Sequence, residues 1–316
     1  MFGIGVDLGA TSIRMAVIND QGEILSKTRR WTESRRGVQA VVRTILDGIK
    51  EITDQISLPV SRTIGIGIGA AGQIHPVTGE VIFAPNLGWA HVPLKSLLPF
   101  EVPIRVDNDV RVVTQGEYKY GVGRGKKTLI CIFIGSGVGS GIVVDGKILR
   151  GRDNAAGEVG HTTVKPDGIL CNCGNKGCLE LYCGGVHLKN RAIQAIQKGR
   201  KSVIPEMVGQ KLEEITPEVL HRAAEQGDPL ALELWSEARE CLGIAISNLV
   251  TIFNPEVIIL GGGVVLSCKS LLPTVEAAVK SNIHLVARSS VQIVESYLGD
   301  DAGVLGAAAM VFDEFG

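Results

Sequence analysis

A short apolar run, a tight glycine loop and a second apolar run follow one another twice in this sequence. The first copy begins at residue 2 with its loop at Gly9-Ala10-Thr11, and the second begins at residue 127 with its loop at Gly135-Ser-Gly-Val-Gly139. A short polar turn and a third strand, residues 23–27 or 147–149, complete each copy, as in a β-hairpin. Two similar units in one chain usually form two similar lobes around one ligand. The repeat therefore predicts an α/β protein with two lobes and a cleft between them.

The length and composition agree with two packed lobes. The chain has 316 residues, of which 45% are hydrophobic and 21% are charged, so there is enough apolar material for two cores. The formal net charge is -1 and no long run of either sign occurs, which argues against a nucleic-acid partner. The sequence begins without the pattern of a signal peptide and has no apolar run long enough to span a bilayer. We expect a cytoplasmic protein with no membrane partner.

Apolar periodicity predicts further elements in each half of the chain. Helices are predicted at residues 36–56, 110–120, 184–198, 216–226 and 229–253. Further strands are predicted at residues 63–70, 103–107 and 257–260. We predict a small N-terminal lobe of residues 1–116, completed by a C-terminal helix at 301–316, and a large lobe of residues 117–300.

Three glycine loops follow predicted strands; the first two can bind an anion, and the third allows a flat ligand to approach the backbone. In Asp7-Leu-Gly-Ala-Thr11, backbone N–H groups can point at a phosphate while Asp7 faces a cation. The loop at residues 135–139 offers similar donors, to which Ser136 can add a hydroxyl, and residues 261–263 are three consecutive glycines. Any one loop could be a simple turn, but three of them favour a nucleotide with Mg²⁺. The first two loops lack the Walker A lysine and lead into strands, which disfavours a Rossmann dehydrogenase.

A cysteine cluster in the second half has the composition of a metal site. Cys171, Cys173 and Cys178 follow His161, and three thiolates with one imidazole suit a closed tetrahedral zinc site. From the residues alone, Cys183 and His187 compete with His161 for the fourth position. The Cys-x-x-Cys spacing of a redox motif is absent. The three other cysteines lie singly in apolar stretches and are expected to be buried thiols: Cys131, Cys241 and Cys268.

Together these motifs resemble those of the ROK family of sugar kinases and repressors, in the actin-like ATPase superfamily. The matching stretches are Asp7-Leu-Gly-Ala-Thr11, Pro85-Asn-Leu-Gly-Trp89, Asn108-Asp109, Gly135-Ser-Gly-Val-Gly139, Gly157-Glu-Val-Gly-His161, Cys171-Asn-Cys-Gly-Asn-Lys-Gly-Cys-Leu-Glu180 and Gly261-Gly-Gly263. The resemblance covers nearly the whole chain and implies two actin-like ATPase (ribonuclease H-like) lobes. It also implies ATP- and Mg²⁺-dependent phosphorylation of a hexose at its 6-hydroxyl, most commonly of glucose. Kinases of N-acetylmannosamine or N-acetylglucosamine are near alternatives, and a homo-oligomer, either a dimer or a tetramer, is expected.

The resemblance implies a role for each motif. It makes Asp109 the catalytic base, whereas from the residues alone Asp109 could be an N-cap of the helix at 110–120. It assigns sugar binding to Gly72, Asn86, Asn108, Asp109, Glu158, His161 and Glu180. It assigns ATP binding to Asp7, Gly9, Ala10, Thr11, Ser12, Gly135, Ser136, Gly137, Val138, Gly139, Gly261, Gly262 and Gly263. It assigns structural Zn²⁺ to His161, Cys171, Cys173 and Cys178.

Three residues depart from the family pattern, of which Ser136 replaces the usual threonine and keeps the hydroxyl group. Ala10 stands where glycine is usual, and its methyl group is expected to restrict the backbone and the approach of a phosphate. Arg111 lies near the implied base, where it could repel or recruit phosphate. The departures at Ala10 and Arg111 keep open a third interpretation, a sugar-binding protein with weakened catalysis, beside a kinase and a sugar-sensing repressor. A repressor of this family carries a helix-turn-helix before the phosphate loop, and with a strand predicted from residue 2 we expect no such module.

Overall fold

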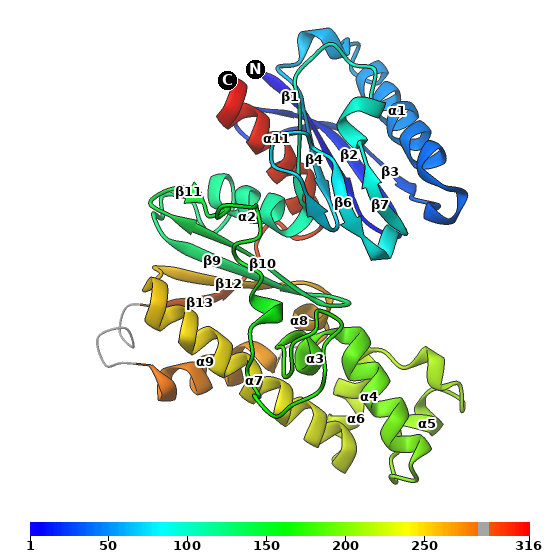
Figure 1. Ribbon diagram of the computed structural model, residues 1–316, viewed down its shortest axis with the longest axis vertical. Coiled ribbons are helices and arrows are strands. Elements are labelled where there is room, and N and C mark those ends of the chain that lie inside the picture. The colour runs from blue at the N-terminus through cyan, green and yellow to red at the C-terminus, as the bar shows by residue number, and fades with distance from the viewer. Residues whose placement is uncertain (269, 284–290) are drawn as a thin grey trace. The chain divides into compact units, whose positions relative to one another are not determined.

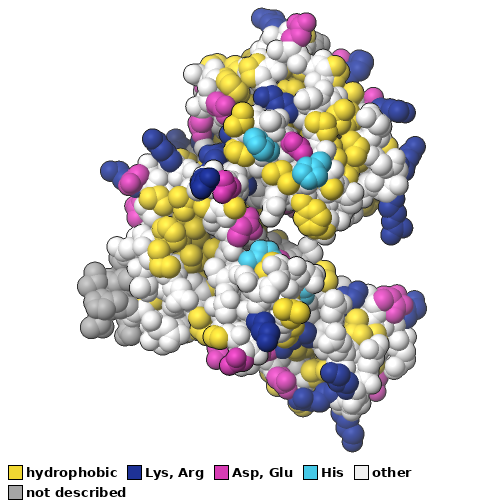
Figure 2. Space-filling model, in the orientation of Figure 1, with side chains coloured by type: hydrophobic (Ala, Val, Ile, Leu, Met, Phe, Trp, Pro, Cys, Tyr) yellow, Lys and Arg dark blue, Asp and Glu magenta, His cyan; other side chains and the backbone are white. Residues whose placement is uncertain are grey.

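The computed structural model describes residues 1–268, 270–283 and 291–316, shown as a ribbon in Figure 1. The chain forms two compact units. Unit 1 contains Met1–Lys127, Gly141–Gly157 and Ser296–Gly316, and unit 2 contains Thr128–Ser140 and Glu158–Glu295. No helix in the described ranges is both long enough and apolar enough to cross a membrane. On the face drawn in Figure 2, Lys and Arg side chains are interspersed with Asp and Glu side chains over both units.

Unit 1 is built on a five-stranded sheet in the order β3-β2-β1-β4-β8. Its strands are β1 (Phe2–Leu8), β2 (Ser12–Asn19), β3 (Ile24–Trp31), β4 (Ile66–Ala70) and β8 (Ile104–Asn108). β1, β2 and β3 pair antiparallel, whereas β1, β4 and β8 pair parallel. A second, three-stranded sheet contains β5 (Gln73–Ile74), β6 (Val81–Ala84) and β7 (Trp89–Val92).

Helices cover both faces of the main sheet of unit 1 (Figure 1). They are α1 (Val38–Asp54), α2 (Asp109–Lys119) and α11 (Ala302–Phe315). Successive residues of β2 point to opposite faces, so Met15 packs in the core with Ile45 of α1, and Ala16 packs with Ala308 of α11. The alternation of apolar side chains in one strand thus serves two separate packing layers.

Unit 2 contains most of the second five-stranded sheet, whose order is β11-β10-β9-β12-β13. Its strands are β9 (Leu129–Ile134), β10 (Val138–Val144), β11 (Lys147–Ile148), β12 (Val257–Gly261) and β13 (Gln292–Glu295). The helices in the described part of the unit are α3 (Glu180–Cys183), α4 (Gly185–Gln197), α5 (Ile204–Met207), α6 (Pro217–Glu225), α7 (Pro229–Phe253), α8 (Gly263–Ser267) and α9 (Leu271–Asn282). The chain leaves unit 2 for unit 1 within β10.

The predicted repeat is confirmed by the strand order of the two sheets. In each sheet three strands consecutive in the sequence, β3-β2-β1 or β11-β10-β9, are followed by two later strands, β4-β8 or β12-β13. The extent of the second glycine loop was predicted wrongly, because β10 already begins at Val138 and the loop is only residues 135–137. The Val138 N–H donates to Glu180 at 2.9 Å, a contact that the sequence did not indicate.

Two glycines allow α11 to lie directly against the sheet of unit 1. A Cβ atom on Gly67 of β4 would lie 1.8 Å from the carbonyl oxygen of Ala307, and one on Gly5 of β1 would lie 2.0 Å from that of Val304. Both obstacles are backbone atoms, which cannot move aside as a side-chain tip can. The helix and the sheet would have to separate to admit a methyl group at either position.

We therefore expect Gly67→Ala to destabilise the protein by about 3 kcal/mol or more, because overpacking against a rigid backbone is at the costly end of such changes. Urea unfolding followed by far-UV circular dichroism measures this. Gly3→Ala on β1 is the matched control, since its Cβ would meet only side-chain atoms of Phe312 and Val311 at 3.2 Å. Equal unfolding midpoints for the two variants would contradict the explanation.

Candidate active site

Asn108 and Asp109 lie where β8 ends and α2 begins. Asn108, not Asp109, is the N-cap, since its Oδ1 accepts hydrogen bonds from the N–H groups of Val110 and Arg111 at 3.0 and 3.1 Å. The alternative interpretation of Asp109 as an N-cap is therefore wrong: Asp109 is the first residue of the helix. Because the amide already caps the helix, the Asp109 carboxylate is not required for that purpose.

The two oxygens of the Asp109 carboxylate differ in their hydrogen bonds. Its Oδ1 accepts from Asn108 Nδ2 and from the N–H of Val110, both at 2.9 Å. Within the described parts of the chain, Oδ2 accepts no hydrogen bond. Burial raises the pKa of Asp109 to about 6 and the nearby Asp7 carboxylate adds to this, although Val110, Arg111 and Asn108 act in the opposite direction. Such a group is ionised at neutral pH and is a stronger base than an ordinary aspartate.

Gly72 is brought next to this pair. Asn108 Nδ2 also donates to the Gly72 carbonyl at 3.1 Å. The φ of Gly72 is +128°, and a Cβ there would lie 2.4 Å from the carbonyl oxygen of Phe83, so glycine is required. Asn86, the fourth sugar-site candidate in unit 1, lies exposed in the 3-10 turn Pro85–Leu87. In the described ranges no hydrogen bond joins Asn86 to the other three.

The first phosphate-loop candidate connects β1 to β2. The Gly9 N–H donates to the Ser12 carbonyl at 3.1 Å, and the Thr32 hydroxyl donates to the Gly9 carbonyl at 2.7 Å, so the loop is held closed. Thr11 is exposed and Ser12 is the first residue of β2. Ala10 is not among the residues with positive φ, so its methyl group fits the backbone of this loop without strain. Its effect on the approach of a phosphate stays a prediction.

Arg14 is a neighbour of Asp7 that sequence reasoning missed. The two residues face each other across β1 and β2, and Arg14 Nη1 lies 3.4 Å from Asp7 Oδ2. Burial raises the pKa of Asp7, and Arg14 acts against this shift. The signal was available in principle, because a hairpin closed around residues 9–11 places residues 7 and 14 opposite each other.

The second loop, residues 135–137, lies against Glu180. A Cβ on Gly137 would lie 2.1 Å from Glu180 Oε2, the same oxygen that accepts from Val138. The neighbouring His187 ring lowers the pKa of Glu180, with further lowering from the Val138 N–H. The Val186 N–H at the start of α4 donates to the Ser136 carbonyl at 3.0 Å. Glu180, a candidate for sugar binding, therefore lies directly against Gly137 and Val138, two candidates for ATP binding.

Close packing explains two of the three glycines in the third loop, residues 261–263. Gly261 ends β12, and Gly262, with φ +93°, would place a Cβ 2.5 Å from the carbonyl oxygen of Ile134. A Cβ on Gly261 would lie 2.4 Å from the ring of Phe133. Gly263 opens α8 with no atom near its absent side chain. Close packing on β9 thus accounts for Gly261 and Gly262, and ATP binding by this loop stays a prediction.

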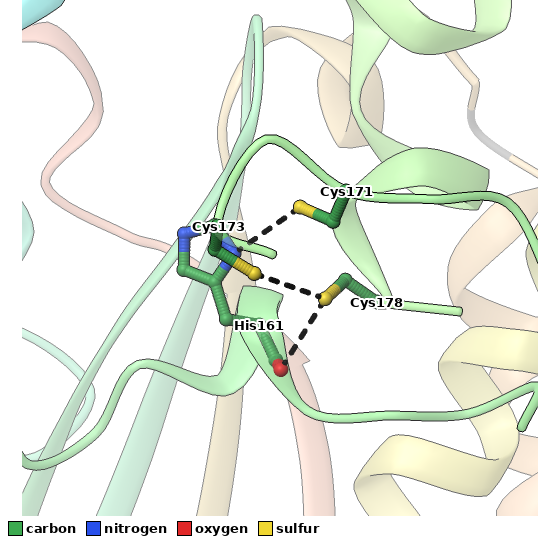
Figure 3. A group of neighbouring side chains, drawn as sticks. All are labelled: His161, Cys171, Cys173 and Cys178. Carbon is green, nitrogen blue, oxygen red and sulfur yellow. Dashed lines mark hydrogen bonds between the residues drawn. The ribbon is translucent and has the colours of Figure 1, made fainter. Parts of the chain in front are cut away.

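His161, Cys171, Cys173 and Cys178 converge on one point (Figure 3). Their ligand atoms all lie within 4.8 Å of one another, with 3.8 Å between Cys171 Sγ and His161 Nδ1 and 3.6 Å between the sulfurs of Cys173 and Cys178. Two sulfurs bound to one tetrahedral zinc ion lie about 3.8 Å apart, which follows from a Zn–S distance of about 2.3 Å. The four residues therefore lie close enough together to hold one metal ion.

The two other candidates for the fourth ligand are occupied elsewhere. Cys183 is buried and its thiol donates to the Ala238 carbonyl at 3.3 Å, while His187 Nε2 lies 3.7 Å from Glu180 Oε1. Burial, with the neighbouring thiols, raises the pKa of Cys178 to about 12, so a thiolate there needs a cation beside it. The three singly placed cysteines are buried, as expected: Cys131, Cys241 and Cys268.

Glu158 and His161 belong to one turn that precedes the cysteine hairpin. The His161 N–H donates to the Glu158 carbonyl at 3.0 Å, and the Val159 N–H donates to the Ser140 hydroxyl at 3.1 Å. Glu158 is exposed and His161 is half-buried. The structure thus places Glu158, His161 and Glu180 in unit 2, and Gly72, Asn86, Asn108 and Asp109 in unit 1.

Sequence comparison identifies the family. The sequence model of the ROK family matches residues 3–314. The chain belongs to the ROK family. It is similar to the glucokinase of Thermotoga maritima, with 34% identity over 99% of this chain and 98% of that protein. It is also similar to the glucokinase of Halalkalibacterium halodurans, with 35% identity over 98% of this chain and 94% of that protein. The xylose repressor of Caldicellulosiruptor bescii is 32% identical over 98% of this chain and 78% of that protein.

Solved ROK structures have the same fold. A ROK family glucokinase from Streptomyces griseus, in complex with glucose and AMPPNP, has a TM-score of 0.82 and 32% identity, over 99% of this chain and 100% of that one. The ROK hexokinase of Thermus thermophilus has a TM-score of 0.85 and 28% identity, over 99% of both chains. These ROK kinases have two lobes of the actin-like ATPase fold, which confirms the predicted fold class.

Proposed function

We propose that this ROK protein is an ATP-dependent hexose kinase that phosphorylates glucose at its 6-hydroxyl. Membership of the family and identity of about one third to two glucokinases support this function. The observation that carries the proposal is the Asp109 carboxylate, with a raised pKa, one oxygen held by Asn108 and the other accepting no hydrogen bond from the described residues. This is the arrangement that a general base for a hydroxyl proton requires.

Phosphoryl transfer needs alignment, charge stabilisation and a place for one proton. The sugar oxygen forms a bond to the γ-phosphorus of ATP while the bond from that phosphorus to the β,γ-bridging oxygen breaks and ADP leaves. The hydroxyl proton moves to Oδ2 of Asp109. Asn108 keeps the carboxylate oriented through Oδ1. We assign Gly72, Asn86 and Asn108 to one side of the sugar, and Glu158, His161 and Glu180 to its other hydroxyls.

The glycine loops are the proposed phosphate sites. Backbone N–H groups of residues 9–12 and 135–139 would receive the phosphates of ATP, except those of Gly9, Gly135 and Val138, which donate within the protein. Asp7 would face Mg²⁺. Bound Mg²⁺ supplies neutralisation of the phosphate charge. Residues 261–263 would lie against the rest of the nucleotide. Arg14 holds Asp7 from the side of β2.

We further propose that the cluster of His161 and three cysteines holds structural Zn²⁺. Nδ1 of His161 faces the sulfurs, which leaves Nε2 for a sugar hydroxyl. A zinc ion at this place would therefore fix the ring that contacts the sugar.

Two observations weaken the case for a catalytically impaired sugar-binding protein. Ala10 is unstrained, and the Arg111 guanidinium, which could have disturbed phosphate, is buried in an ion pair with Asp107. N-acetylmannosamine and N-acetylglucosamine remain candidate substrates, because they differ from common hexoses at the 2-position, which Glu180 and the residues around Gly72 would contact. We also expect the kinase to form a homo-oligomer, which light scattering on purified protein measures.

Release of ADP on incubation with ATP, Mg²⁺ and a panel of sugars tests the proposed function. We expect turnover with glucose, with kcat between about 1 and 100 s⁻¹. The panel includes mannose, N-acetylglucosamine and N-acetylmannosamine, and the position of the new phosphate is read by NMR. Turnover of an N-acetylhexosamine alone would change the substrate but keep the kinase. A folded, metal-loaded protein that turns over no sugar would refute the proposal.

A further inference from the structure

A buried carboxylate, for which the proposed function gives no role, directly precedes Asn108 and the proposed base. Asp107 of β8 is 2% exposed. Its Oδ1 accepts from Arg111 Nε at 3.0 Å, and its Oδ2 accepts from Arg150 Nη2 at 2.8 Å. Arg111 is itself 3% exposed, whereas Arg150 is half-buried. These three residues are called the Asp107 network below.

The charged groups of the Asp107 network lose favourable hydration when they are buried, which costs free energy of folding. Burial alone would raise the pKa of Asp107, but the charges of Arg111 and Arg150 lower it below the ordinary value of an aspartate. Buried ion pairs often contribute no more stability than apolar side chains of similar volume. Stability alone therefore does not explain why two guanidinium groups converge on this carboxylate.

A short chain of hydrogen bonds joins the network to the proposed base. The Asn108 N–H donates to Asp107 Oδ1 at 2.8 Å, and the Arg111 N–H donates to Asn108 Oδ1 at 3.1 Å. Asn108 Nδ2 in turn donates to Asp109 Oδ1 at 2.9 Å. The backbone and side chain of Asn108 are thus both fixed by members of the network, and Asn108 fixes Asp109.

Charged groups of both signs surround Asp109 from several elements of unit 1. Asp7 of β1 and Arg111 of α2 act on Asp109 directly. Each is itself paired, Asp7 with Arg14 of β2 and Arg111 with Asp107 of β8, which also binds Arg150, two residues after β11. Burial and Asp7 raise the pKa of Asp109, whereas the positive charge of Arg111 lowers it. Removal of Arg111 would therefore alter both the orientation and the basicity of the carboxylate.

We propose that Asp107, Arg111 and Arg150 are positioning residues for phosphoryl transfer, which hold Asn108 and Asp109 in the reactive orientation without touching the substrate. The inference rests on the proposed role of Asp109 as the base. It gives Arg111, which departs from the family pattern, a function within this chain. It also ties the segment after β11 to the end of β8.

The test compares Arg111→Met, Arg111→Lys and Arg150→Met with the parent kinase. We expect Arg111→Met to lower kcat by about 10- to 100-fold, as small displacements of a reacting group do. The KM for MgATP should stay within about twofold, since binding of the nucleotide is not removed. The acidic limb of the pH profile of kcat/KM should move upward by up to about one pH unit, because a neighbouring positive charge is lost.

Arg111→Lys separates charge from geometry. Lysine keeps the positive charge but cannot reproduce the guanidinium contact, so the acidic limb should return close to that of the parent and kcat only in part. Arg150→Met changes a half-buried side chain and is the variant that should fold if Arg111→Met does not; we expect the same direction of change in kcat. Arg105→Met is the control, since Arg105 lies on β8 but pairs with Glu314 at 3.2 Å.

If the Asp107 network were purely structural, Arg111→Met and Arg150→Met would lower the melting temperature without moving the acidic limb of the pH profile of kcat/KM. Folded Arg111→Met or Arg150→Met protein with the kcat and pH profile of the parent would overturn the inference. Asp109→Asn is measured in parallel: if it retains activity, the proposed base is wrong. If Asp109→Asn is inactive while both arginine variants behave like the parent, only the role of the Asp107 network fails.

Discussion

Asp109→Asn is expected to lower kcat by about 10²- to 10⁴-fold, the usual contribution of a general base. The amide keeps the shape of the side chain but cannot accept the sugar proton on a free carboxylate oxygen. Binding of glucose, measured by calorimetric titration, should change much less, because Asn108 and Gly72 remain in place. In the parent enzyme kcat/KM should fall as the pH drops through about 6, where Asp109 becomes protonated.

The same substitution is expected to make the protein more stable. The pKa of Asp109 is raised from 3.8 to about 6 on folding, so the folded state binds the proton more tightly than the unfolded state. The unfolding free energy therefore falls as pH rises between these two values, and the full cost is present at neutral pH. Asparagine resembles the protonated form, and we expect a gain on the order of 1 to 3 kcal/mol at pH 7.

Thermal unfolding at pH 7 and at pH 4 measures this gain, which should shrink at the lower pH. Asp54→Asn is the matched control, because Asp54 is an exposed partner of Lys50 and should affect neither kcat nor the melting temperature. A folded Asp109→Asn enzyme with kcat close to that of the parent would remove Asp109 from the mechanism. If the parent and the variant are equally stable, the raised pKa of Asp109 is contradicted but its role as the base is not.

The second large effect concerns the proposed zinc ion. Elemental analysis should find about one zinc per chain, because the four residues offer a complete tetrahedral ligand set. Removal by a chelator should weaken glucose binding by about 10-fold or more, since metal and sugar share His161. Cys173→Ser should act in the same direction: Cys173 is exposed, so its replacement removes a ligand with little loss of packing.

Cys268→Ser is the control for this experiment. Cys268 is a buried thiol of unit 2 whose sulfur lies 3.3 Å from His221 Nδ1, far from the cluster in sequence, and serine can keep that contact. The control should retain zinc and glucose affinity. Unchanged glucose affinity after verified loss of zinc would separate the metal from the sugar site. A purified protein that contains no zinc and binds none on titration would refute the metal proposal itself.

Much of the fold could be predicted because long periodic segments and the repeat carry strong signals. α1 and α7 lie within two residues of their predicted bounds. The strands β5, β6 and β7 were missed, since segments of two to four residues show too little alternation to separate them from loops. Their pairing depends on partners that periodicity within one segment does not identify.

The candidate site was predicted from motif order rather than from contacts. Asn108 and Asp109 adjoin in the sequence, so their proximity to each other followed directly. The pairing of Arg111 with Asp107 could not be predicted from the sequence in this way. The four-residue spacing that brings side chains together within a helix does not apply across the end of a strand. The φ of Ala10 likewise depends on how the loop closes, which the residue type alone does not determine.

Unit 1 is assembled from the beginning, the middle and the end of the chain. β1 starts at Phe2, yet the helix that packs against its glycine face, α11, runs from Ala302 to Phe315. At about 5 to 20 residues per second, the ribosome makes α11 roughly 15 to 60 s after β1. During synthesis the first sheet therefore has α2 but not α11 on one of its apolar faces, while unit 2, which needs no later segment, can complete its core first.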